Sequence, residues 1–469
     1  MSESSRAGRR GLGLALVLLP ALAALGCGRR ADAPSVLLIT LDTTRARALG
    51  CYGNPFGTTP HLDRLAEEGT LYEQARTVAP VTLPAHASML TGLYPPRHGL
   101  RDNGLWALSG AAETVAERAA AAGVQTGAIV AAPVLHRRYG LAQGFDSYSQ
   151  PSTAGQSGRL EMDYRQADEI ADEAIAWWQA RAGGPRFLWV HFFDPHEPYR
   201  PQPALLERVG GRAYLAEVAA MDAAIGRLLA AMREDGSLDR STVLVIGDHG
   251  EDFQLHGEPT HSVTCYDTTL RVPFLIRRPG AAGAGQRIRA PVSVADAAPT
   301  IASALGLAPG VGLDGIDLLA APPDRRGVYF ESYVGYLNYG WSPVSGWLDA
   351  EGKYLHSAVP EFFQPLRDAD EREDRIADTP AARLEPYREA LRLLAAAPAL
   401  AGVPPRALAA QDPAELREPC YAGFRYPPAA PPSPGLSPAA PPCPHRRPQA
   451  PRAPYQAARL AVPRADAPA

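Results

Sequence analysis

Three apolar segments of this chain are each followed by an aspartate, directly or after one glycine. The segments are 35–41, 187–193 and 242–246, and the aspartates are Asp42, Asp194 and Asp248. Apolar runs without alternation are typical of parallel strands that helices cover on both faces. Ligands of open α/β sheets bind beside the carboxyl ends of the strands, so the three aspartates are expected to converge at one edge of a sheet.

Segments with a helical pattern separate these strands. The segment 214–234 places Val218, Met221 and Ile225 on one face, which is the spacing of an amphipathic helix. Further helices are expected at 60–68, 111–122, 166–181 and 296–305. The alternation of strands and helices predicts the α/β class with a mainly parallel central sheet.

The pattern changes after about residue 327. Short strands are expected at 328–331, 346–348 and 353–356, the last two joined as a hairpin. We therefore divide the chain into a main domain at 34–326 and a small C-terminal α+β subdomain at 327–400. Residues 403–469 are rich in Pro and Ala with few large apolar residues, so disorder is expected there.

The first 27 residues have the features of an export signal. Arg9 and Arg10 precede an apolar run at 11–26, which is short for a membrane span and ends at Cys27. The run resembles a bacterial lipoprotein signal, in which Cys27 would carry lipid and tether the protein to the membrane. That reading predicts the cell envelope, on the periplasmic or extracellular face; ordinary secretion and an uncleaved anchor are the alternatives.

Charge and cysteine content exclude two classes of function. The formal net charge of -4 gives no electrostatic basis for binding nucleic acid. No two of the five cysteines form a Cys-x-x-Cys pair, which argues against a zinc–thiolate site.

A hydroxyl group near the start of a predicted helix is a candidate nucleophile. Pro84 suits a first helical position and Gly92 a helix end, which places Thr82 at the helix entrance. Free N–H groups and the helix dipole favour an anion there, so Thr82 is suited to attack a phosphate or sulfate ester. The alternative is a simple threonine N-cap.

The aspartates and an adjacent histidine predict a metal site. Asp42, Thr82, Asp248 and His249 would supply three oxygens and one nitrogen. This set suits one divalent cation, with Zn²⁺ or Mn²⁺ preferred and Ca²⁺ also compatible. Each aspartate alone has the alternative of a turn residue or helix cap. A bound cation would lower the pKa of the Thr82 hydroxyl.

Further histidines accompany this set. His86 lies one helical turn after Thr82 and is assigned, with His196, to the catalytic group. His256 and His261, together with Asp194, are assigned to substrate binding. Any one of these histidines alone is more often an ordinary surface or loop residue.

In these residues and several further motifs, the chain resembles the sulfatase family of the alkaline phosphatase superfamily. The similar motifs run in the family's order over about 34–374, and include Asp42 to Arg45, Thr59 to Asp63, Thr82 to Gly92, Pro96 to Gly99, Asp194 to Tyr199 and Gly247 to Gly250. The resemblance implies an α/β/α sandwich on a central sheet, with a metal at the strand ends.

Two departures from the family pattern bear on the reaction. Sulfatases carry, at the position of Thr82, a Cys or Ser that is oxidised to formylglycine, and an Arg where this chain has His86. Threonine cannot give that aldehyde because its β-carbon carries a methyl group, so no formylglycine is expected. Thr43 replaces an acid that often ligates Ca²⁺ in the family.

These departures favour a hydrolase or transferase acting on phosphate esters, mono- or diesters, through Thr82. Sulfate-ester hydrolysis on sulfated glycans or lipids is the alternative, and a catalytically silent binding protein of the same fold is a third. The expected partners are a small-molecule, glycan or lipid ester and, through Cys27, a membrane.

Overall fold

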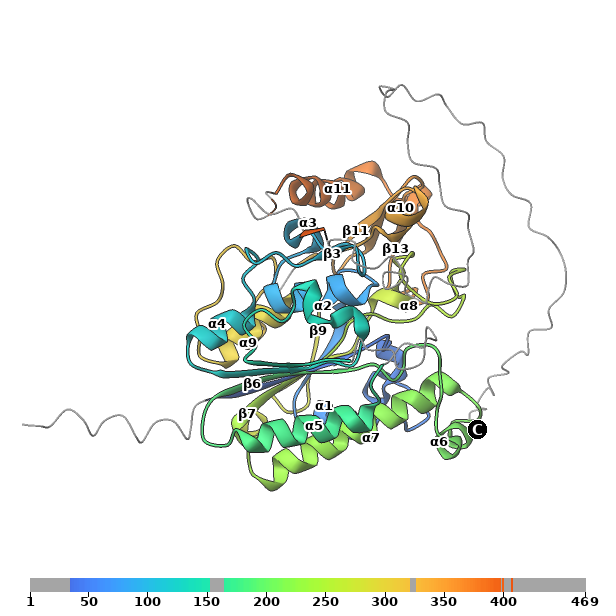
Figure 1. The fold of residues 1–469 in the computed structure, drawn as a ribbon. Helices are drawn as coiled ribbons and strands as arrows, with labels where there is room; N and C mark the ends of the chain where they lie inside the picture. Colours follow the sequence, from blue (N-terminus) through green and yellow to red (C-terminus); the bar gives the residue numbers. More distant parts are fainter. Residues whose placement is uncertain (1–33, 152–163, 321–325, 398, 400–405, 408–469) are drawn as a thin grey trace, which may run out of the picture. The chain divides into compact units, whose positions relative to one another are not determined.

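The computed structural model describes residues 34–151, 164–320, 326–397, 399 and 406–407 (Figure 1). All of them belong to one compact unit, Met1–Ala422. The predicted signal segment at 1–27 lies outside the described residues. So does the predicted disordered tail, apart from β14 (Arg406–Ala407), which pairs with β3 (Trp106–Ala107). The domain boundaries stay predictions.

An eight-stranded sheet in the order β5-β4-β6-β1-β7-β8-β2-β9 forms the centre of the fold. Its strands are β1 (Ser35–Leu41), β2 (Thr70–Arg76), β4 (Gln125–Ile129), β5 (Ser147–Ser149), β6 (Arg186–Phe192), β7 (Ser241–Gly247), β8 (Phe274–Arg277) and β9 (Gln286–Ser293). Strand β1 pairs in parallel with β6 and β7, and only β8 runs antiparallel to its neighbours within this sheet. The predicted mainly parallel sheet is confirmed.

Helices cover both faces of this sheet (Figure 1). One face carries α1 (Pro60–Glu67), α5 (Ala167–Ala180) and α7 (Ala213–Glu234), and the other carries α2 (Thr82–Thr91), α4 (Val115–Ala121) and α9 (Ala297–Ala304). The β strands 35–41 and 241–247 are buried along their whole length, as their unbroken apolar sequence predicts. The predicted α/β/α sandwich is therefore confirmed.

A second, antiparallel sheet lies in the C-terminal part. Its strands are β10 (Val328–Ser332), β11 (Val344–Leu348), β12 (Lys353–His356) and β13 (Glu361–Phe363), with α10 (Val334–Tyr339) and α11 (Ala381–Ala396) beside them in sequence. The hairpin of β11 and β12 is as predicted.

Buried charges join this second sheet to the central one. Lys353 Nζ of β12 lies 2.8 Å from Glu371 and 3.4 Å from Asp267, and Arg76 of β2 lies 2.6 Å from the other oxygen of Asp267. The four side chains are at most 5% exposed. Burying any one of these charges without its partners would cost several kcal/mol. The four side chains therefore stabilise the folded protein only when all of them are present.

Some elements differ from the prediction. The helix expected at 111–122 begins only at Val115, because Thr114 and Glu117 form a capping box that fixes its start. Strand β2 was not predicted, since its sequence has no clear alternation, and α11 was not predicted because Pro386 interrupts its helical pattern.

Membrane-spanning helices were searched for in the described ranges, and no helix there has the length and apolarity needed to cross a bilayer.

Candidate active site

Helix α2 carries the predicted nucleophile in its first turn. It begins at Thr82 itself, with Val81 as N-cap, and ends at Gly92, whose φ of 72° is the left-handed conformation that suits glycine. Pro84 was predicted at the first helical position, but it occupies the third. Since no side-chain cap bond forms at this end, the N-cap alternative for Thr82 is wrong.

The N–H groups of this helix end are largely accounted for. Leu83 N–H donates to Asn103 Oδ1 at 2.9 Å, and Pro84 has no N–H. The anion site expected at the helix entrance is thus reduced to the N–H of Thr82. Asn103 was not predicted; its own N–H donates to Asp102, whose second oxygen accepts from Asn338 of α10.

Asp42 and Asp248 converge as predicted. They follow β1 and β7, which are adjacent parallel strands, and both side chains are fully buried. Asp248 Oδ1 accepts the N–H groups of Thr43 at 3.1 Å and of His249 at 2.6 Å. Asp248 Oδ2 and both oxygens of Asp42 have no hydrogen-bond partner among the described residues.

These unpartnered oxygens are electrostatically unfavourable by themselves. Burial raises the pKa of Asp42 to about 8 and the pKa of Asp248 well above its usual range, the charge of Asp42 adding to the effect on Asp248. A divalent cation would offset both charges and occupy the free lone pairs.

His249 completes a donor set for such a cation. Its Nδ1–H donates to the carbonyl of Gly250 at 3.1 Å, which leaves a lone pair on Nε2. That nitrogen lies 3.7 Å from Asp42 Oδ1, 3.5 Å from Asp248 Oδ2 and 3.2 Å from Thr82 Oγ1. A ligating histidine that donates its other N–H to a carbonyl is the usual arrangement in metal sites. The four residues predicted as ligands therefore lie together and fit one cation, while their role as ligands stays a prediction.

The third aspartate is directed elsewhere. Asp194 Oδ1 accepts the N–H of Ala167 at 2.9 Å, at the first residue of α5. This is the helix-cap alternative, and it corrects the expectation that three aspartates converge. The assignment of Asp194 to substrate binding stays a prediction with no contact in its support.

His86 does not face the Thr82 hydroxyl. Its Nδ1–H donates to the main-chain oxygen of Thr82 at 2.8 Å, and its Nε2 accepts from Thr40 Oγ1 at 3.0 Å. Thr40 in turn accepts from Trp189 Nε1. Both ring nitrogens of His86 are thus engaged with protein groups, which speaks against the catalytic role predicted from its spacing.

His261 and His196 lie beside the metal-ligand candidates. The ring of His261 is 4.3 Å from that of His249 and 5.3 Å from that of His196. Burial lowers the pKa of His261, but the charge of Glu251 and a contact at 3.4 Å outweigh this and raise the pKa to about 9. Burial lowers the pKa of His196 to about 3, and its Nδ1–H donates to the carbonyl of Glu197.

His256 lies in a different setting. Its Nδ1 donates to Asp252 at 3.0 Å and its Nε2 to the carbonyl of Asp370 at 2.9 Å, while its ring stacks on Tyr266. With both nitrogens donating to protein, His256 has none left for a substrate. This geometry speaks against the predicted substrate-binding role.

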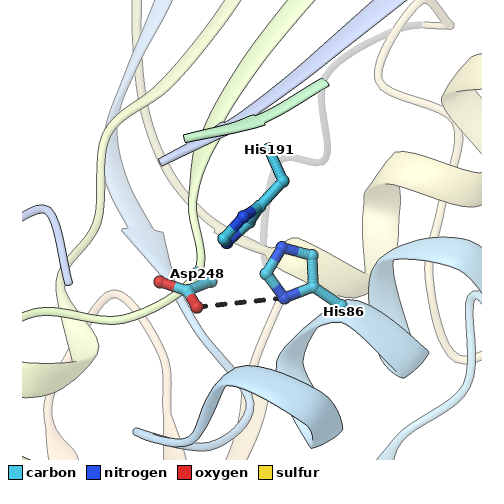
Figure 2. Close-up of side chains that lie close together, drawn as sticks. All are labelled: His86, His191 and Asp248. Atoms are coloured by element: carbon cyan, nitrogen blue, oxygen red, sulfur yellow. Dashed lines mark ion pairs between the residues drawn. The ribbon is translucent and has the colours of Figure 1, made fainter. Parts of the chain in front are cut away.

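The sequence reasoning missed one histidine of the site. His191 of β6 is fully buried, and its Nε2 lies 3.2 Å from Asp42 Oδ2. Figure 2 shows its ring beside His86 and Asp248. A local signal was present, because His191 is the one ionisable residue in the apolar run 187–193, and a buried polar side chain needs a partner.

The sequence matches known proteins of one family. The sequence model described as Sulfatase matches residues 34–307. An ulvan-active sulfatase of Formosa agariphila is 29% identical over 339 residues, covering 61% of this chain and 64% of that protein. The steryl-sulfatase of Mus musculus is 27% identical over 401 residues, with the same two coverages of 61% and 64%. The chain thus spans just under two thirds of these relatives.

Solved structures show the same fold at lower identity. A phosphonate monoester hydrolase of Agrobacterium radiobacter superposes with a TM-score of 0.63 at 22% identity, covering 77% of this chain and 95% of that one. A protein in complex with its substrate D-glucosamine-2-N,6-O-disulfate superposes with a TM-score of 0.67 at 21% identity, covering 77% and 97%.

The match at 34–307 takes in the strands β1, β6 and β7, the helix of Thr82 and the converging Asp42 and Asp248. It covers more than half of the 469-residue chain. From this match and the shared fold, the protein is a member of the sulfatase family.

Proposed function

We propose that this protein is a metal-dependent hydrolase of sulfate or phosphate esters in which Thr82 is the nucleophile. The observation that carries the proposal is the position of Thr82 Oγ1, 3.2 Å from His249 Nε2 and beside two buried carboxylates with unpartnered oxygens. A silent binding protein would have no need of these costly buried charges.

The relatives favour a sulfate ester as the substrate. Those named above are an ulvan-active sulfatase and a steryl-sulfatase, and one structural neighbour holds a disulfated sugar. We therefore place sulfate-ester hydrolysis first, although the residues of the chain alone favoured a phosphate ester.

A phosphate or phosphonate ester is the second candidate, and Thr82 itself supports it. The methyl group on its β-carbon prevents formation of the formylglycine aldehyde, so the hydroxyl must attack directly. Direct attack by an alcohol is a common route in phosphoryl transfer, and one structural neighbour is a phosphonate monoester hydrolase.

The side chains suggest the following reaction. A divalent cation held by Asp42, Asp248, His249 and Thr82 would lower the pKa of the Thr82 hydroxyl and neutralise charge on the ester. Thr82 Oγ1 loses its proton to solvent and bonds to the sulfur or phosphorus, while the bond to the leaving-group oxygen breaks. Water then attacks the same sulfur or phosphorus and gives one proton to the group that protonated the leaving oxygen. The bond to Thr82 Oγ1 breaks, and Oγ1 takes up a proton from solvent.

His261 is the better candidate for donating a proton to the leaving oxygen. Its ring lies beside His249 and contacts Glu251, whose charge raises its pKa, whereas burial lowers the pKa of His196, whose Nδ1–H donates to Glu197.

The test is a substrate panel against a metal panel. We would measure turnover of 4-nitrophenyl sulfate, 4-nitrophenyl phosphate and bis(4-nitrophenyl) phosphate with Zn²⁺, Mn²⁺ and Ca²⁺. Metal-dependent turnover that is lost in Asp248→Asn is the expected result. A clear preference for either ester decides between the two candidates, and metal-loaded, folded protein without any turnover would favour the silent protein.

We further propose that the protein acts in the cell envelope on a glycan or lipid ester, tethered through lipid on Cys27. Support comes from the sequence of residues 1–27 alone. Globomycin, which blocks lipoprotein signal cleavage, should cause the uncleaved precursor to accumulate in a bacterial host.

A further inference from the structure

Two groups of side chains in the described residues have the spacing of metal ligands, and they share Asp248. The first is Asp42, Asp248 and His249, and the second is His86, His191 and Asp248 (Figure 2). All are buried. Which ring nitrogens carry protons decides whether the second group can also hold a cation, since a ligating nitrogen needs a free lone pair.

His86 has no lone pair to offer. The partner of Nδ1 is a carbonyl oxygen, which only accepts, so Nδ1 must carry a proton. Nε2 holds the remaining lone pair, and the hydroxyl of Thr40 donates to it. The 3.8 Å approach of His86 Nδ1 to Asp248 Oδ2 is therefore that of an N–H group already engaged at 2.8 Å with Thr82.

His191 has the opposite tautomer. Its Nδ1 accepts the main-chain N–H of Ala131 at 3.3 Å and is therefore unprotonated. The ring proton must then be on Nε2, the nitrogen that faces Asp42 at 3.2 Å. Ligation through Nε2 would require an imidazole that has lost both protons, so neither histidine of the second group is placed to hold a metal.

The two carboxylates of the first group differ in how they are held. Asp248 has one oxygen fixed by two main-chain N–H groups and the other oxygen free. Asp42 has Oδ1 toward His249 Nε2 at 3.7 Å and Oδ2 toward His191 Nε2 at 3.2 Å. Neither contact of Asp42 is an aligned hydrogen bond, and His191 Nε2 has no other partner among the described residues.

We propose that His191 is the positioning residue of Asp42: its Nε2–H holds Oδ2 and thereby leaves Oδ1 for the cation. For this bond to form, the carboxylate or the ring must turn from its present position so that the N–H meets Oδ2. Asp42 then matches Asp248, with one oxygen held by protein N–H and one directed at the metal. The inference rests on the metal site of the proposed function. It adds a residue that does not ligate the metal itself but orients one of its ligands.

Metal affinity tests this inference without any substrate. We would strip the full-length protein with a chelator and titrate Zn²⁺ against a competing indicator for wild type, His191→Leu, His191→Asn and His191→Gln. Removing an outer partner of a ligand typically weakens metal binding by about 10- to 100-fold. His191→Leu should show that loss. His191→Asn should show it too, because it can still accept from Ala131 N–H but does not reach Asp42.

His191→Gln separates positioning from ligation. Its amide N–H₂ reaches the place of Nε2–H, so it should restore most of the affinity if His191 donates to Asp42. The Co²⁺-loaded Gln variant should then keep the wild-type visible spectrum, because the number of nitrogen ligands is unchanged. A weakened Gln variant with an altered Co²⁺ spectrum would overturn the inference in favour of His191 as a ligand.

His98 is a matched control. It is also a buried neutral ring whose Nδ1 accepts a main-chain N–H, that of Leu100, while Nε2 bonds to Ser88, away from the carboxylates. His98→Leu should disturb packing but not metal affinity. Wild-type affinity in both the folded Leu and Asn variants of His191 would overturn the inference alone, whereas a wild-type protein that binds no Zn²⁺, Mn²⁺ or Ca²⁺ would overturn the proposed metal site and this inference with it.

Discussion

His86 Nδ1 donates to the main-chain oxygen of Thr82 at 2.8 Å, so a side chain one turn along α2 holds the peptide group of the proposed nucleophile. The same ring is anchored on its other side by Thr40 of β1 at 3.0 Å. Thr82 is thereby linked to the strand that Asp42 directly follows, so a buried contact helps to set the distance between Thr82 and Asp42.

Replacing His86 should slow the reaction without abolishing metal binding. His86→Leu removes both contacts, and a nucleophile displaced by about 1 Å can lose about 100-fold in rate. His86→Asn keeps a donor close to the position of Nδ1 and should recover part of that loss. Turnover number and Zn²⁺ affinity measured together check this; a loss of metal binding as large as that of Asp248→Asn would show that His86 acts on the cation.

Two substitutions of Thr82 should distinguish the contribution of its hydroxyl to turnover from that of its methyl group. Thr82→Ala should lose at least about a thousandfold in turnover, since the nucleophile is gone. Thr82→Ser keeps the hydroxyl and removes one buried methyl, so we expect a loss of at most about tenfold. Intact mass must show an unmodified serine in this variant. Full activity of Thr82→Ala would mean that water attacks directly.

Lys353→Met should destabilise the protein strongly, because it leaves Glu371 and part of the charge of Asp267 unpaired in the interior. Breaking a buried ion pair from one side costs about 3–5 kcal/mol. The double variant Lys353→Met with Glu371→Leu removes both charges and should regain most of that stability. Urea unfolding measures both; a double variant less stable than the single one would contradict the argument.

His256 should contribute stability that is lost at alkaline pH. Burial lowers its pKa, but the hydrogen bond and charge of Asp252 outweigh this and raise it. A histidine with a raised pKa in the folded state contributes fully below its unfolded pKa of about 6.5, and the contribution disappears as pH rises through the folded value. His256→Gln should therefore cost about 1 kcal/mol at pH 6 and progressively less above pH 7.

The same variant tests the role of His256 in substrate binding. Because both nitrogens of His256 donate to protein, we expect an unchanged KM for the ester substrate. A raised KM with unaltered stability would restore the substrate-binding role predicted from the sequence.

The strands and the metal-ligand candidates could be predicted from the sequence for a simple reason. Asp42 and Asp248 directly follow the buried strands β1 and β7, so the position in the chain already fixes the position in the sheet. The same reasoning failed for Asp194, which also follows a buried strand. Its side chain accepts the N–H of Ala167 at the start of α5. This contact sets the rotamer of Asp194, and the sequence around Asp194 does not predict it.

His191 and Asn103 were not predictable for a related reason. His191 is defined by its contacts to Asp42 and Ala131, and Asn103 by its contact to Leu83, all made between elements distant in sequence. Asn103 is not unusual in its own segment, whereas His191 is the one ionisable residue of an apolar run, a signal that does not identify its partners. Their roles arise from packing, which a pattern of apolar spacing does not encode.

The hydrogen bond from Leu83 N–H to Asn103 has a consequence for the surface of the protein. Asn103 binds Asp102, and Asp102 binds Asn338 of α10, a helix whose Tyr336 is 50% exposed. The backbone next to Thr82 is thus the inner end of a chain of hydrogen bonds whose outer end is Asn338 of α10. Because these hydrogen bonds link α10 to the first turn of α2, a substitution at Asn338 on the outside of the protein is expected to disturb the backbone beside Thr82.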